Sequence, residues 1–375
     1  MFSLTLKALP INRKDAKMPD TLYKYAIIGT GIPHEHPGPK GYGMANTHWP
    51  AFNSTGKVEL VAIADIIPEH SASFLQRHGQ QAREYSDYET LLQRENVDIV
   101  SICTWPHLHA SISIACAKAG VKVIHCEKPM AITWDEAKAM KQAAEEAGAL
   151  MSFGHQRRLI RLFQHVRALI ESGSIGTLVQ IEAHCPNLYD WGSHWLDMLQ
   201  YYNGDSDVDW VMGQVESNTE TRIFGALHEN QGLLVYRWKN GVTGILLTGA
   251  KSSIGCIHRI IGTEGIIEVL TERKYRIFDR KGHNGDEVEV PQGDQSDHQL
   301  SAADVIRQLD EPGYVSTLNI SNAIKATELY FAAYYSSMHR GRIDLPLEYG
   351  GNALISMFDS GEIGPNRKNL EGVIG

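Results

Sequence analysis

Apolar and polar residues follow two different patterns along this 375-residue chain. In the first 150 residues, short runs rich in valine and isoleucine occur at 25–29, 58–65, 97–104, 121–127 and 149–153. Continuous apolarity of this kind is typical of strands that are buried on both faces of a parallel sheet. Helical patterns lie between them and end at glycines, at 68–79, 107–120 and 133–148. The alternation predicts an α/β fold with a doubly wound parallel sheet of the Rossmann type.

The pattern changes after residue 153. A helix is predicted at 157–173, and apolar and polar residues then alternate along longer strands at 177–184, 232–250 and 256–270. Such alternation indicates a sheet with one solvent-exposed face, which is typical of antiparallel pairing. Asn240-Gly241 predicts a hairpin turn, and a last helix is predicted at 321–338. We therefore expect a second, α+β domain with a large, mainly antiparallel sheet.

Composition and charge narrow the class of protein. Apolar residues make up 43% of the chain, and its formal net charge is −9. An acidic chain lacks the basic face that nucleic-acid binding requires. The chain also has no run of about 18 apolar residues that would predict a membrane span. The five cysteines are odd in number and form no CxxC pair, so we expect reduced thiols in a cytoplasmic protein.

The first predicted strand runs into a loop that contains two glycines. Gly29 and Gly31 match the start of the G-x-G-x-x-G/A motif, which binds the pyrophosphate of a dinucleotide. The third small residue of the motif is Ala45 if residues 32–44 are an insertion, and long insertions in surface loops cost little stability. Without a ligand, the same glycines would form only a tight turn.

The residue that ends the second predicted strand favours one cofactor. Asp65 follows the apolar run at the distance where an acidic residue accepts a hydrogen bond from the ribose 2′-hydroxyl. A carboxylate there repels the 2′-phosphate of NADP, and Ile66, Ile67 and Pro68 supply no compensating cation. We predict NAD as the cofactor, with NADP disfavoured.

Histidines near the glycine loop raise the question of a metal. The insertion carries His34 and His36, and His48 follows soon after. No cysteine or carboxylate cluster accompanies them, so we predict no metal site and interpret the insertion as a loop at the cofactor entrance or at a subunit contact.

These observations predict four segments, which are a leader at 1–22, a dinucleotide-binding Rossmann domain at 23–153, a substrate and oligomerisation domain at 154–348, and a tail at 349–375. The leader is expected to be disordered. The helix at 321–338 is expected to pack back on the Rossmann domain, and the polar stretch from 280 to 297 is expected to be an exposed loop.

A set of motifs now points to a family. Glu127-Lys128-Pro129 follows a predicted parallel strand directly, at the edge of the sheet where ligands bind. The segment CTWPHLHA at 103–110 is similar to a T-P-P-H-x-H-A loop, with tryptophan in place of the first proline. Further matches are GHQRR at 154–158, RIIGTEGIIEV at 259–269 and GRIDLPL at 341–347. In this order the motifs resemble the Gfo/Idh/MocA oxidoreductases, which include glucose–fructose oxidoreductase and inositol dehydrogenase.

The resemblance implies the cofactor contacts and the groups that carry the chemistry. Beyond the glycine loop, the cofactor contacts would be Thr104, Trp105, His109, Glu127 and Lys128. The segment LYDWGSHWLDML at 188–199 contains the family pattern D-x-x-x-H as Asp190 and His194.

The same segment suggests acid–base chemistry. On a helix, Asp190, His194 and Asp197 would share one side. A carboxylate beside an imidazole fixes its tautomer and raises its basicity, and oxidation of an alcohol needs a base for the hydroxyl proton. By resemblance, His194 would be the general base or acid and Asp190 its partner. Asp197 would hold the helix or orient His194.

Lys128 would complete the catalytic group by stabilising charge on the reacting oxygen. It could also be the base itself, with His194 positioning the substrate, and the sequence leaves both assignments open.

Aromatic and polar residues near these motifs suggest a sugar or polyol as substrate. Flat aromatic faces suit rings rich in C–H groups, and imidazole or guanidinium groups suit hydroxyls. The candidate substrate contacts are Trp105, His107, His155, Arg157, Tyr189 and Trp191.

The combined expectation is an NAD-dependent oxidoreductase that interconverts a secondary alcohol and a ketone on a sugar, inositol or glycoside. We also expect a homo-oligomer, a dimer or a tetramer, because an open sheet with an apolar face favours pairing. One alternative is an enzyme that retains its NAD and uses transient oxidation of a sugar for hydrolysis or elimination. Another is a ligand sensor without catalysis.

Overall fold

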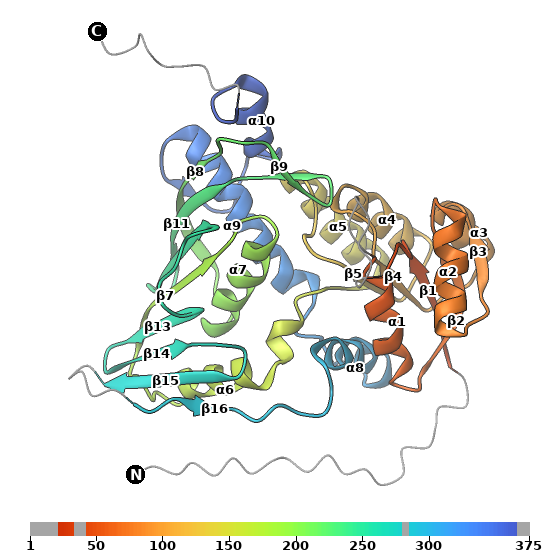
Figure 1. Cartoon of the computed structure of the whole chain (residues 1–375), viewed down its shortest axis with the longest axis horizontal. Coiled ribbons are helices and arrows are strands. Elements are labelled where there is room, and N and C mark those ends of the chain that lie inside the picture. Colours follow the sequence, from red (N-terminus) through yellow and green to blue (C-terminus); the bar gives the residue numbers. More distant parts are fainter. Residues whose placement is uncertain (1–21, 34–42, 280–284, 366–375) are drawn as a thin grey trace.

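The computed structural model describes residues 22–33, 43–279 and 285–365. A parallel sheet with its helices forms one half of the molecule, and a larger, mostly antiparallel sheet forms the other (Figure 1). The predicted leader up to residue 21, most of the insertion with His34 and His36, and the last ten residues lie outside the described part.

The parallel sheet has six strands in the order β3-β2-β1-β4-β5-β6, which is the strand order of a Rossmann fold. Because all neighbouring strands are parallel, the carboxyl ends of β1, β4 and β5 meet at one edge. The strands are β1 (Tyr23–Ile28), β2 (Val58–Ala64), β3 (Arg83–Tyr85), β4 (Ile99–Ile102), β5 (Val123–Cys126) and β6 (Leu150–Phe153). The helices are α1 (Ala45–Asn53), α2 (Pro68–His78), α3 (Tyr88–Arg94), α4 (Pro106–Lys118) and α5 (Trp134–Ala147).

Local sequence signals explain the helix ends. The side chains of Thr133 and Glu136 form the reciprocal capping box that opens α5, and Gly148 ends the helix in the left-handed conformation. Gly79 ends α2 in the same way. The five predicted strands and three predicted helices of this half are confirmed. β3 and α3 were not predicted from the pattern, because they are only three and seven residues long.

The second sheet has nine strands in the order β16-β15-β14-β13-β7-β12-β11-β8-β17, and a separate hairpin forms from β9 and β10. All pairs in the large sheet are antiparallel except β7 with β12, which confirms a mainly antiparallel sheet. The strands are β7 (Leu178–Cys185), β8 (Val208–Glu216), β9 (Thr221–Ile223), β10 (Ala226–His228), β11 (Gln231–Trp238), β12 (Thr243–Gly249), β13 (His258–Gly262), β14 (Gly265–Val269), β15 (Lys274–Asp279), β16 (Val288–Glu289) and β17 (Ile343–Asp344).

Helices cover one face of this sheet and connect it to the Rossmann half. Helices α7 and α9 contact strands of the sheet, and α9 also contacts α5 and β6. Helix α8 packs against α1, so that a late segment of the chain covers part of the Rossmann half (Figure 1). The helices of this half are the 3₁₀ helix η1 (Gln156–Leu159), α6 (Arg161–Glu171), α7 (Trp191–Tyr202), α8 (Asp297–Asp310), α9 (Ile320–His339) and α10 (Ala353–Ser360).

Three elements differ from the sequence analysis. The single helix predicted at 157–173 is divided at Ile160, whose extended backbone separates η1 from α6. No helix was predicted for α8, although Ser296 and Gln299 form a capping box there. Helix α10 lies in the segment that was expected to be a tail, and the side chain of Asn352 caps it.

The buried apolar side chains of the described residues form two clusters. All five cysteines are buried and free of disulfides, so they act as core residues. Within the described part of the chain, no helix is long and apolar enough to cross a membrane.

Candidate active site

The glycine loop after β1 needs backbone conformations that favour glycine. Gly29 and Gly31 have φ of +87° and +54°. A Cβ at Gly29 would lie 2.8 Å from Cγ2 of Thr104, so a side chain there would collide with the loop after β4. Ala45 begins α1, as the displaced motif predicts, and the first turn of α1 has neither an acidic residue nor a side-chain cap. The positive end of α1 therefore suits a pyrophosphate.

Asp65 lies beside this loop at the end of β2. Its Oδ2 accepts hydrogen bonds of 2.9 Å from the backbone N–H groups of Thr30 and Gly31 and from the Thr30 hydroxyl. Its Oδ1 accepts another from the backbone N–H of Ile67. These bonds hold the carboxylate next to the glycine turn, which is where the ribose of a dinucleotide lies in this fold.

The loop after β4 supplies a polar atom without a protein partner. The hydroxyl of Thr104 is buried and makes no hydrogen bond to the described residues. His109 joins this loop to the next one, because its ring nitrogens contact the carbonyl oxygens of Pro129 at 2.8 Å and Thr104 at 3.0 Å. His109 is fully buried. It therefore holds the loops after β4 and β5 together, and its position does not support the predicted direct contact with a cofactor. The left-handed glycines, the open helix end and the Thr104 hydroxyl fit a dinucleotide.

A buried polar chain fixes the residue before Lys128. The Tyr25 hydroxyl donates to Ser101, and Oγ of Ser101 lies 3.2 Å from Nδ1 of His48. Nε2 of His48 then contacts Glu127 at 2.7 Å. Burial opposes ionisation of Glu127, but the bond from His48 and neighbouring positive charges lower its pKa to about 2. Glu127 also accepts the backbone N–H of Lys128, so the chain connects α1 to the lysine.

Lys128 and Asp190 meet across the two halves of the molecule. Nζ of Lys128 lies 2.5 Å from Oδ1 of Asp190, and both side chains are largely buried. Asp190 precedes α7, and its own backbone N–H donates to the side chain of Asn187. The sequence analysis expected Asp190 to be the partner of His194. This expectation is wrong, because the carboxylate of Asp190 pairs with Lys128.

His194 lies one turn further along α7 and is buried. Its Nδ1 makes no hydrogen bond to the described residues. Burial, and then the charges of Arg157 and Lys128, lower the pKa of His194 well below its ordinary value. The imidazole is therefore neutral near pH 7, and no carboxylate raises its basicity as the spacing suggested.

Asp197 anchors α7 to the start of the second half. Nε and Nη2 of Arg158 each lie 2.8 Å from the carboxylate of Asp197, and Nη2 also donates to Asp205 at 2.7 Å. Nδ1 of His155 lies 3.3 Å from Asp197, and its ring is 5.7 Å from that of His194. Burial opposes ionisation of Asp197, but Arg158 and His155 lower its pKa to about 2. Asp197 thus holds the helix, which was one of the two predicted roles.

The candidate substrate contacts fall into two groups. Arg157 lies over the rings of Trp195 and Trp191, with 4.9 Å and 5.5 Å from its Cζ to the ring centroids. Trp105 lies near the β9–β10 hairpin, because a Cβ added at Gly225 would lie 3.0 Å from its ring. The exposed His107 contacts the ring of Trp105.

Tyr189 does not belong to either group. Its side chain is buried, its hydroxyl donates to the carbonyl of Ala131, and its ring packs against Tyr330. The prediction of Tyr189 as a substrate contact is wrong, because this face of the segment points into the core.

Sequence reasoning missed several residues of the site. His298 on α8 lies 6.3 Å from His48 by ring centroids, and Glu272 lies 3.4 Å from Arg157. The capping box at the start of α8 could have indicated the helix that carries His298, whereas no local sequence feature indicates Glu272. No group of three or more metal-ligating side chains occurs among the described residues, and His48 is bound to Glu127.

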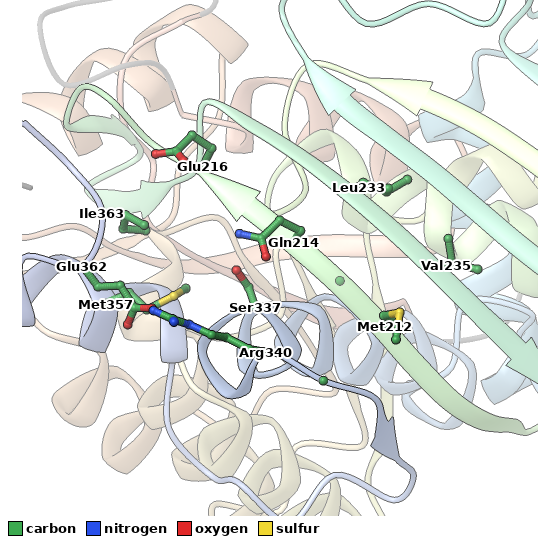
Figure 2. Close-up of a pocket in the computed structure, with 12 residues that line it drawn as sticks. Met212, Gln214, Glu216, Leu233, Val235, Ser337, Arg340, Met357, Glu362 and Ile363 are labelled. Carbon is green, nitrogen blue, oxygen red and sulfur yellow. The ribbon is translucent and has the colours of Figure 1, made fainter. Parts of the chain in front are cut away.

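One cavity of the described structure lies away from these residues. It has a volume of about 580 Å³ and lies on the outer side of β8 and β11, beside α9 and α10 (Figure 2). Met212, Leu233 and Val235 form its apolar wall, while Arg340 and Glu362 lie at the other side. The cavity has none of the acid–base groups described above, so the candidate site is the group of residues around Lys128 and His194.

The comparisons with known proteins agree with this geometry. Residues 23–155 match the model of the Gfo/Idh/MocA oxidoreductase family, described as an NAD-binding Rossmann fold. Among solved structures, levoglucosan dehydrogenase in complex with NADH and levoglucosan has a TM-score of 0.74 at 20% identity, over 87% of this chain and 100% of that one. Residues 23–155 are therefore similar to the Gfo/Idh/MocA family, in agreement with the resemblance found in the sequence, and the fold over most of the chain is shared with such structures.

Curated relatives match over smaller parts of this chain. A myo-inositol 2-dehydrogenase of Thermotoga maritima is 26% identical over 245 residues, which is 60% of this chain and 72% of that protein. An inositol 2-dehydrogenase of Salmonella typhimurium is 30% identical over 125 residues, which is 33% of this chain. That match spans only 37% of the length of the Salmonella protein.

Proposed function

We propose that this protein is an NAD-dependent oxidoreductase that interconverts a secondary alcohol and a ketone on a sugar, inositol or glycoside. The observation that carries the proposal is the pair of Lys128 and Asp190, held at 2.5 Å beside the buried His194 at the carboxyl edge of the parallel sheet. The names of the relatives support the substrate class, since they include dehydrogenases of inositol and levoglucosan.

The chain would hold the cofactor and the substrate from two sides. Gly29, Gly31 and α1 would bind the pyrophosphate, and Asp65 would bind the adenosine ribose, with the exposed Ile66 beside it. Bound NAD would supply the hydride acceptor. Lys128 would donate a hydrogen bond to the reacting oxygen, and its position is fixed by Asp190 and by the polar chain that ends at Glu127.

His194 would take the hydroxyl proton in this proposal. It is neutral near pH 7, and its Nδ1 is free of a partner among the described residues. A base must be unprotonated before it can accept a proton, and a positioned base of this kind contributes about 10²–10⁴-fold to the rate. Lys128 would then act as the electrostatic partner, which favours one of the two assignments left open by the sequence.

The first prediction concerns turnover and the choice of cofactor. We expect the purified protein to produce NADH from NAD with at least one member of a panel of inositols, hexoses and glycosides, as measured by the absorbance of NADH. Because the carboxylate of Asp65 repels a 2′-phosphate, we expect kcat/KM for NADP to be about 10²-fold lower, equivalent to about 2–3 kcal/mol. Equal use of both cofactors would contradict the role given to Asp65.

The same assay separates the alternatives. Release of a sugar or an unsaturated product without free NADH, from protein that purifies with bound NAD, would identify an enzyme that recycles its cofactor. Binding of a sugar without any turnover, unchanged in Lys128→Ala and His194→Ala, would identify a sensor and overturn the proposal.

The second prediction concerns assembly, for which the outer face of the nine-stranded sheet provides the surface. Met212, Leu233 and Val179 are 52%, 44% and 41% exposed on strands whose other face is buried. We propose that this face pairs with a second copy of the chain, so that light scattering after size exclusion gives a dimer or a tetramer. Leu233→Glu should shift the protein toward the monomer, whereas Val315→Glu, on an exposed loop, should not. A monomeric wild type would refute the proposal.

A further inference from the structure

Two adjacent arginines in the candidate site have very different surroundings. Arg158 is fully buried, and four of its contacts at 2.7–3.1 Å reach the carboxylates of Asp197 and Asp205. These carboxylates raise the pKa of Arg158 although burial opposes the charged form. Its hydrogen-bonding capacity is used within the protein, so Arg158 has a structural role.

Arg157 lacks such partners. Its side chain is only 13% exposed, and its one ion pair with the described residues joins Nε to Oε1 of Glu272 at 3.4 Å. This contact is not aligned as a hydrogen bond, and Nε is a buried atom without a hydrogen-bond partner among the described residues. Burial lowers the pKa of Arg157 in spite of the nearby Glu272, Asp297 and Asp190. A largely buried cation whose Nε has one weak ion pair and no hydrogen bond costs free energy that a bound anion would offset.

The position of Arg157 links this cation to the reaction. The guanidinium lies over two tryptophan rings, and one of them, Trp191, is 41% exposed. Asp190, the carboxylate nearest to the chemistry, is already paired with Lys128. Of the charges that oppose protonation of His194, Arg157 is the largest, ahead of Lys128, His155 and His298.

We propose that the substrate carries a carboxylate and that Arg157 binds it. This inference rests on the proposed function, because it names the substrate class of the same site as sugar acids. A guanidinium offers two parallel N–H donors that match the two oxygens of a carboxylate. Arg157 is a single planar cation that lies over aromatic rings, and this arrangement suits a planar anion with one charge. A phosphate ester carries a second charge, which would need further donors. The bound anion would also reduce the charge that most opposes proton transfer to His194.

Glu272 holds the position of this anion when no substrate is bound. It lies in the turn between β14 and β15, its side chain is 49% exposed, and its backbone carbonyl accepts a bond from Gln292. An exposed carboxylate at 3.4 Å is a weak partner, and its side chain can rotate into the solvent at little cost in free energy. Glu272 is therefore a competitor of the substrate carboxylate, and its removal should strengthen binding.

The test compares a sugar acid with its neutral amide on NAD-loaded protein. The probes are D-glucuronate and D-glucuronamide, and the corresponding galactose pair, with dissociation constants from calorimetry. Because a bond to a charged group is worth about 1.5–3 kcal/mol, we expect wild type to bind an acid about 10–100-fold more tightly than its amide. Arg157→Met should bring this ratio close to one, and Arg157→Lys should give an intermediate ratio. Glu272→Gln should increase the ratio.

Controls make each outcome decisive. Arg167→Met is the matched control, because Arg167 also lies over an aromatic ring, at 4.4 Å from Tyr201, and pairs with Glu171 on α6 outside the site. It should leave the ratio unchanged. The inference is overturned if wild type does not prefer the acid, if Arg157→Met weakens acid and amide equally, or if Glu272→Gln lowers the ratio. Turnover of a neutral inositol by wild type is measured separately, so failure of the proposed function is recognised independently. If Arg157→Met does not fold, the wild-type ratio and Glu272→Gln decide.

Discussion

Lys128→Met will lower kcat by about 10³-fold, within the range of about 10²–10⁴ expected when a positioned charge or proton-transfer group is lost. The reason lies in the geometry, because Nζ of Lys128 meets Asp190 at the edge where β5 ends, and methionine keeps the length of the side chain without its charge. The dissociation constant of NAD should change far less than kcat, since the glycine loop and Asp65 remain intact. Steady-state kinetics and equilibrium binding of NAD measure the two quantities.

The control for this variant is a lysine at the opposite end of β5. Lys122 precedes β5, is 63% exposed and pairs with Asp98 outside the candidate site. Lys122→Met should leave kcat unchanged, because an exposed pair contributes little. A Lys128→Met enzyme that keeps more than about a third of the wild-type kcat would contradict the electrostatic role, as would a loss of NAD binding that accounts for the whole effect.

Residues whose roles depend on local sequence were predicted well. Gly29, Gly31 and Ala45 form a turn and a helix start because backbone conformation and helix capping are local properties. The parallel strands also follow from local patterns, since runs buried on both faces have no polar alternation. The position of Glu127-Lys128 at a strand end follows directly from the strand assignment.

Pairing between distant segments was not predictable in the same way. The spacing of Asp190 and His194 describes neighbours on a helix, but Asp190 precedes α7 and its carboxylate meets Lys128, which is 62 residues away in sequence. The two adjacent arginines at 157 and 158 look alike in the sequence, yet only the fold brings Asp197 and Asp205 to one of them. Tyr189 was misassigned for the same reason, since the next residue, Asp190, meets Lys128 while the ring of Tyr189 packs against Tyr330.

Arg158→Met will cause the largest loss of stability among the changes considered. It leaves the buried Asp197 without its main partner, and breaking a buried ion pair in this way costs about 3–5 kcal/mol. The free energy of unfolding in urea measures the effect. The double change Arg158→Met with Asp197→Leu should recover much of it, because removing both charges avoids an unpaired buried carboxylate. The matched control is Arg259→Met, since Arg259 also bridges two carboxylates, Glu182 and Glu268, but is 29% exposed.

The pH dependence of stability provides an independent check of this ion pair. Asp197 has a pKa of about 2 in the folded protein, below the ordinary value of about 4 for an aspartate. A depressed folded pKa means that the contribution of Asp197 is fully present above about pH 4 and is lost as the pH falls toward 2. The double variant lacks this group, so its stability should fall less steeply than that of the wild type in this window. Two results would show that the ion pair does not hold α7 in place. One is an equal dependence of stability on pH in the wild type and the double variant. The other is a loss of stability in Arg158→Met that is no larger than in Arg259→Met.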